Sequence, residues 1–82
     1  MELKDTIGFM TSEDYKNRFV AEYMQTKIRA EKLQIVVNRY DRGELDFELN
    51  CPIELLKRQL RTMREYLLIL DCRAEMEGVV LL

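Results

Sequence analysis

The chain has no histidine and no tryptophan, and it has only one proline, three glycines and two cysteines in 82 residues. Without histidine, the side chain most often used for proton transfer is missing. No Cys-x-x-Cys pair, glycine-rich phosphate loop or nucleophile elbow occurs. Cys51 and Cys72 have no ligand partners at zinc spacing. We therefore expect no catalysis, no metal centre and no cofactor, and we expect both cysteines to be reduced and buried.

Long apolar runs and an excess of one charge are also missing. No stretch approaches the roughly 20 apolar residues that a membrane helix needs, and a formal net charge of −2 gives no basic excess for nucleic acid. The first five residues, Met1 to Asp5, include acids where a targeting peptide has bases. These features predict a soluble cytoplasmic protein with no membrane contact and no general nucleic-acid binding.

The few helix-breaking residues divide the chain, since Gly8, Gly43, Pro52 and Gly78 fall where helices begin or end. They predict a single all-α domain over residues 1–82. Its expected parts are a short arm (1–10), a helix (about 12–40), a structured connection (41–50), a second helix (about 51–77) and an apolar tail (78–82).

Both predicted helices carry a row of mostly apolar residues at alternating spacings of three and four, which is the period of a coiled-coil seam. The row of the first helix is Tyr15, Phe19, Tyr23, Thr26, Ala30, Leu33, Val37 and Tyr40, and that of the second is Ile53, Leu56, Leu60, Met63, Leu67, Leu70 and Ala74. Two such rows predict a long antiparallel two-helix hairpin.

Each helix has a second stripe that this seam cannot cover. On the first helix it lies about 140° from the Phe19 row, and on the second about 110° from the Leu60 row, at 100° per residue. We therefore expect the hairpin to assemble as a dimeric four-helix bundle or a higher oligomer. The first stripe is Val20, Met24, Ile28 and Ile35; the other is Leu55, Gln59, Thr62, Tyr66, Ile69, Arg73 and Met76.

Polar and aromatic residues suggest where a ligand could bind. Tyr15, Arg18 and Glu22 lie within about 60° of one another on the first helix, and antiparallel pairing brings Arg73 and Tyr66 to the same end. An aromatic ring beside arginines can stack a base while the cations hold phosphate. The alternative is that Tyr15 is a core aromatic at the helix end and that Arg18 pairs with Glu22.

Four cations, Lys57, Arg58, Arg61 and Arg64, lie within two turns of the second helix. Guanidinium groups bind phosphate oxygens bidentately, so the run is a candidate anion site. Its alternative is an ordinary solvated face, because Glu54 and Glu65 each stand four residues from an arginine.

A pattern of single residues from Asp14 to Ala74 resembles small uncharacterised phage proteins of the crAss-like phage group. The residues that carry the resemblance are Tyr15, Arg18, Glu22, Lys32-Leu33, Leu55-Leu56, Gln59, Met63, Tyr66 and Arg73. More loosely, the layout is similar to the helical-hairpin sponges of phages, the anti-CBASS and anti-Thoeris proteins. That similarity implies oligomers that bind a cyclic nucleotide between protomers through aromatic and basic residues.

The resulting hypothesis is a phage counter-defence protein of the infected bacterial cytoplasm that sequesters a small, cyclic nucleotide immune signal without catalysis. Tyr15 and Tyr66 would stack on the base, Arg18, Arg64 and Arg73 would hold phosphates, and Glu22 would accept a hydrogen bond. The rival is an inhibitor or adaptor that blocks a host defence protein through an exposed helical face, with a phage accessory scaffold as a third possibility.

Overall fold

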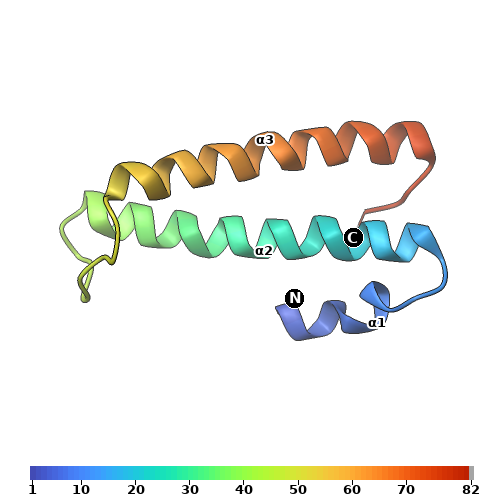
Figure 1. Ribbon diagram of the computed structural model, residues 1–82, viewed down its shortest axis with the longest axis horizontal. Coiled ribbons are helices and arrows are strands. Elements are labelled where there is room, and N and C mark those ends of the chain that lie inside the picture. Colours follow the sequence, from blue (N-terminus) through green and yellow to red (C-terminus); the bar gives the residue numbers. More distant parts are fainter. Residues whose placement is uncertain (82) are drawn as a thin grey trace.

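The computed structural model describes residues 1–81, in which every regular element is a helix and no strand occurs. A short 3-10 helix, η1 (Leu3–Thr6), leads into α1 (Ile7–Met10). Two long helices follow, α2 (Tyr15–Asp41) and α3 (Ile53–Glu77), and they lie antiparallel and side by side (Figure 1). The predicted hairpin is therefore confirmed, and its assembly with further copies stays a prediction. No helix in residues 1–81 has the length and apolarity needed to cross a membrane.

The helix boundaries follow from their caps. α2 begins three residues later than predicted because its N-cap is Asp14, whose carboxylate accepts a hydrogen bond from the Lys16 backbone N–H at 2.9 Å. The Ser12 hydroxyl instead accepts the Asp14 N–H at 3.1 Å in the preceding loop. α3 follows Pro52, where a missing N–H costs nothing. It ends at Gly78, whose φ of 69° suits glycine.

The core lies along the seam between α2 and α3. Its centre is Leu70, which is fully buried. One cluster, at the Gly78 end, contains Phe19, Val20, Met24, Leu70, Ala74 and Val79, and a second, nearer the connecting loop, contains Ala30, Val37 and Leu60. All the α2 and α3 members except Val20 and Met24 belong to the predicted seam rows, so the heptad pattern identified the inner faces of both helices.

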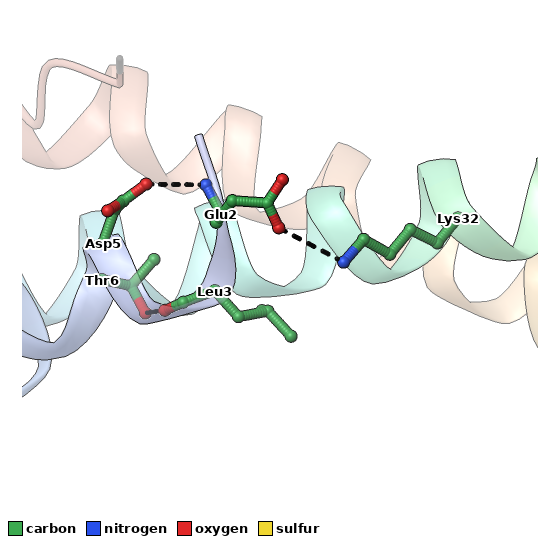
Figure 2. A network of polar contacts seen from close by, with 5 residues as sticks. All are labelled: Glu2, Leu3, Asp5, Thr6 and Lys32. Carbon is green, nitrogen blue, oxygen red and sulfur yellow. Dashed lines mark hydrogen bonds and ion pairs between the residues drawn. The ribbon is translucent and has the colours of Figure 1, made fainter.

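The N-terminal segment is not the plain arm that the sequence predicted, because residues 3–10 are helical. Figure 1 shows α1 on the side of α2 that faces away from α3. The buried Thr6 hydroxyl donates to the Leu3 carbonyl at 2.7 Å and accepts from the Gln25 side-chain amide of α2 at 3.0 Å. Figure 2 shows the Thr6–Leu3 contact and an ion pair, at 3.5 Å, between Glu2 and Lys32 of α2. These contacts hold the segment along α2.

This segment and the tail change the account of the second stripe on α2. We expected Val20, Met24 and Ile28 to need a partner molecule, but each is buried within the chain at 8% exposure or less. Phe9 and the tail residue Val79 pack in the same cluster as Val20 and Met24. Ile35 remains 52% exposed, because the N-terminal segment starts near Lys32 and does not reach it. The prediction that Val20, Met24 and Ile28 need a partner molecule was therefore wrong.

The tail and the cysteines also differ from expectation. Val79 is buried and Leu81 packs against the core, whereas Val80 is 81% exposed; Leu82 lies outside the described residues. Cys72 is exposed and Cys51 is half-buried, so the prediction of two buried thiols was wrong. Cys72 follows the buried Leu70 by two residues, which turns it about 200° away from the seam.

A substitution at the centre of the seam tests the hairpin core. We expect Leu70→Ala to lower the free energy of unfolding by about 3 kcal/mol, because it leaves a cavity in a fully buried site. Leu68→Ala is the matched control, since Leu68 is 60% exposed and its loss should cost less than about 0.5 kcal/mol. Urea unfolding followed by circular dichroism measures both, and equal losses would contradict the described seam.

A second substitution tests the docking of the N-terminal segment. Thr6→Val removes the hydroxyl that joins Leu3 to Gln25, so we expect a loss of about 1–2 kcal/mol and faster amide exchange in residues 3–10. Thr11→Val is the control, because the Thr11 hydroxyl is exposed and bonds only locally to the Ile7 carbonyl. Unchanged exchange in Thr6→Val would show that the segment docks without this contact.

Candidate functional site

Arg73 is the centre of a polar cluster near the end of the hairpin where α2 begins and α3 ends. Its guanidinium carbon lies 4.9 Å from the centroid of the Phe19 ring, a cation–π distance. Its Nε donates to one carboxylate oxygen of Glu77 at 2.8 Å, and one Nη donates to the other at 3.4 Å. The Phe19 ring therefore packs against one face of the guanidinium, and the Glu77 carboxylate binds one of its edges.

Two of the other predicted site residues, Tyr15 and Glu22, stand four residues before and three residues after Phe19, whose ring the guanidinium contacts. The pKa of Arg73 is raised above its ordinary value, chiefly by the hydrogen bond to Glu77, with smaller contributions from the negative charges of Glu77 and Glu22. Tyr15 is 47% exposed, and Glu22 is also exposed. Spacings of four and three place Tyr15 and Glu22 on the same side of α2 as Phe19, which is the side that Arg73 of α3 contacts.

Arg18 and Tyr66 are less closely joined to this cluster. The Arg18 guanidinium donates to the Ser12 carbonyl at 2.7 Å, so it contacts the loop before α2. Tyr66 is 39% exposed and precedes Arg73 by seven residues, which places it about 10 Å along the same side of α3. A ligand that reaches both Tyr66 and Arg73 must therefore extend along the helix.

Arg64 lies on a different face of the hairpin. It is nine residues from Arg73, or about 180° around α3 at 100° per residue. Its guanidinium donates to the Gln34 side-chain amide. Arg64 also lines a depression of about 390 Å³ between α2 and α3, together with Tyr23, Lys27, Ala30, Glu31, Leu67, Leu68 and Asp71. The predicted site residues are therefore divided between two faces.

The rest of the cationic run is partly neutralised. Lys57 Nζ lies 3.0 Å from a carboxylate oxygen of Asp41, at the end of α2. This hydrogen bond is the main reason that the pKa of Lys57 is raised. The charge of Lys57 is therefore balanced by an acid of the other long helix.

Another depression, of about 610 Å³, lies beside the connecting loop. Its lining includes the carboxylate of Glu48 and no cationic side chain, so it offers no charge to a phosphate. The other lining residues are Tyr40, Gly43, Leu45, Phe47, Leu49, Cys51, Pro52 and Ile53.

The Arg73 side of the hairpin also exposes large apolar side chains, and we call it the open face. On α3 it carries the predicted second stripe, whose members Leu55, Ile69 and Met76 are 52%, 50% and 86% exposed. Unlike the corresponding stripe of α2, this row is not covered by the N-terminal segment or the tail. The open face comprises Tyr15 and Tyr40 of α2 and Leu55, Gln59, Thr62, Tyr66, Ile69, Arg73 and Met76 of α3.

Sequence reasoning missed two residues of the Arg73 cluster. Phe19 was assigned only to the seam, although its ring also supports the guanidinium. Glu77 was not assigned to the candidate site, although it is the main partner of Arg73. The four-residue spacing of Arg73 and Glu77 was the available signal. Among residues 1–81, no group of three or more Cys, Asp or Glu side chains is placed to hold a metal ion.

Comparison with known proteins adds one finding. The family model described as Sequestin matches residues 13–76, more than three quarters of the chain. The chain belongs to the Sequestin family. That family name denotes sequestration, which is a binding role and not a catalytic one. Neither the curated proteins nor the solved structures give a significant match.

The Sequestin match coincides with the hairpin itself. It starts just before the Asp14 cap and ends one residue before the last residue of α3. It therefore includes Tyr15, Glu22, Tyr66 and Arg73, but neither the N-terminal helical segment nor the tail. The open face belongs to the part of the chain that defines the family.

Tyr23 lines the depression beside Arg64, and its proton gives a prediction about the pH dependence of stability. Burial, followed by a hydrogen bond to Asp71, raises the pKa of Tyr23 above 10.0. The folded state holds the hydroxyl proton of Tyr23 more tightly than the unfolded state does. The resulting stabilisation of the fold is therefore complete below about pH 10, and it is lost as the pH rises through the higher pKa that Tyr23 has in the folded state.

We expect Asp71→Asn to lower the pKa of Tyr23, because it removes the neighbouring negative charge. Asp46→Asn is the control, since Asp46 lies in the connecting loop. Titration of the tyrosine rings by NMR measures the change. If Tyr23 titrates identically in both variants, the Asp71 contact does not govern its proton.

Proposed function

We propose that the protein sequesters a small nucleotide, of the cyclic or ADP-ribose class, by non-covalent binding, and that it serves a phage as a counter-defence protein. Membership of the Sequestin family supports a sequestering role. The observation that carries the choice of nucleotide is that the Arg73 guanidinium lies on the Phe19 ring, with the exposed side chains of Tyr15 and Glu22 on either side of Phe19 along α2. This cluster combines an exposed aromatic ring, a fixed guanidinium and a carboxylate.

In this proposal each group of the cluster has its own role. A guanidinium has five N–H groups, and Glu77 accepts from two of those of Arg73. Three therefore remain for phosphate oxygens. Phe19 and Glu77 hold the guanidinium in place, so little side-chain freedom is lost when an anion binds.

Tyr15 and Glu22 would recognise the nucleoside part. Because the Tyr15 side chain is exposed, its ring is free to stack on a base. The Glu22 carboxylate can accept a hydrogen bond from a ribose hydroxyl or a base amine. Tyr66 would join the site in an extended ligand, and Arg18 would contribute only after releasing the Ser12 carbonyl. Arg64 faces the other depression and takes no part.

A second candidate function is an inhibitor or adaptor that binds a host protein through the open face. Its support is the exposure of Leu55, Ile69 and Met76, since an apolar row on a helix is typical of helix-in-groove binding. The tail gives this reading less support than the sequence suggested, because Val79 is packed in the core.

Titration calorimetry of the full chain against cyclic di- and trinucleotides and ADP-ribose derivatives tests the proposal. We expect at least one of them to bind, and we expect Arg73→Gln to weaken that binding by about tenfold to a hundredfold, because a charge-assisted phosphate contact is lost. Tyr15→Leu should also weaken it by about tenfold, through the lost stacking.

The matched control is Arg61→Gln, which removes an exposed arginine of the same helix on another face. It should leave the affinity within about twofold, apart from general electrostatics. No heat with any nucleotide would reject the proposal. Retention of a host protein that Leu55→Glu abolishes would favour the inhibitor instead.

A further inference from the structure

The exposed row of α3 has an internal symmetry about Tyr66. When the row is aligned with a copy of itself that runs in the opposite direction, the residues pair as follows: Leu55 with Met76, Gln59 with Arg73, Thr62 with Ile69, and Tyr66 with Tyr66. Apolar ends meet apolar ends, and the amide meets the guanidinium. A two-fold symmetric contact requires this kind of self-complementary surface.

The shape of the row shows the same complementarity. Near its beginning, Leu55, Gln59 and Thr62 line a depression of about 410 Å³, with Arg58 and Met63. Near its end, Met76 projects from the helix and is 86% exposed. The hollow and the projection lie about 25 Å apart on one molecule, so they cannot meet within the chain. An antiparallel pair of α3 helices brings each projection onto the partner's hollow.

We propose that two copies associate through this row of α3, antiparallel, with the two-fold axis beside Tyr66. A second copy is favoured over another occupant because the hollow, the projection and the polar pair all match within this one sequence. The Tyr66 rings of the two copies meet at the centre. Exposed apolar residues at both ends, Leu55, Ile69 and Met76, become covered without help from another protein.

This register also completes the candidate site. Arg73 of one protomer comes opposite the partner's Gln59, whose carbonyl oxygen can accept one of the three free guanidinium N–H groups. The Tyr15–Glu22–Arg73 cluster is then closed on one side by Gln59 of the partner subunit. The assembly holds two such sites, about 20 Å apart, on either side of Tyr66. This last step rests on the proposed function, whereas the interface itself does not.

Sedimentation velocity of the full chain, without nucleotide and over a concentration series, tests the interface. We expect a dimer. Gln59→Arg should weaken it by about tenfold or more, because two guanidinium groups then face each other across the axis. Adding Arg73→Gln should recover most of that loss, since the amide–guanidinium pair is restored with its members exchanged.

Glu75→Gln is the control, because it adds the same unit of charge on another side of α3 and should leave the dimer within about twofold. A monomer at every concentration would overturn the proposal. So would a Gln59→Arg protein that dimerises like the wild type, or a double variant that shows no recovery. Circular dichroism of each variant checks that the helices are retained.

Disulfide cross-linking tests the register separately. In a Cys51→Ser, Cys72→Ser background, Tyr66→Cys should form a covalent dimer under mild oxidation, because the two-fold axis passes beside this position. Arg61→Cys, on another face of the same helix, should not. Faster cross-linking at position 61 would overturn the register. These measurements use no ligand, so a failed nucleotide titration would reject the proposed function and leave the interface standing.

Discussion

A helix that has only one long neighbour can bury only one stripe, and the rest of this structure follows from that constraint. α2 and α3 cover each other along a seam centred on Leu70. The chain covers the further stripe of α2 internally, with α1 on one side and Val79 of the tail nearby. It provides no such cover for the second stripe of α3, so Leu55, Ile69 and Met76 stay exposed on one face of that helix.

The polar residues within that exposed row give it its chemical character. An ordinary buried stripe would be apolar throughout, because a buried polar group without a partner is costly. Here Arg73 is already held by Glu77 and by the face of the Phe19 ring, beside Tyr15 and Glu22. A guanidinium that is held in place and still has free N–H groups is suited to binding an anion.

The open face can serve both association and ligand capture, and the two uses are compatible. A symmetric pair would cover Leu55, Ile69 and Met76 while placing an amide of the second copy beside Arg73. Sequestration depends on affinity alone, so a site enclosed between two protomers can gain affinity by shielding its phosphate contacts from water. Sequestin membership is restricted to the hairpin, which is the part that carries this surface.

The sequence by itself determined the elements with strong local signals. The heptad spacing predicted both helices and their inner faces, and Pro52 and Gly78 marked the limits of α3, because period and capping depend on residues close together in the chain. Only the tertiary structure decided that residues 3–10 fold against α2 through Thr6 and Gln25. It also decided that Arg64 faces away from Arg73, and that Phe19 and Glu77 hold that guanidinium. These outcomes depend on how helices rotate and pack against one another, which spacing along one helix does not specify.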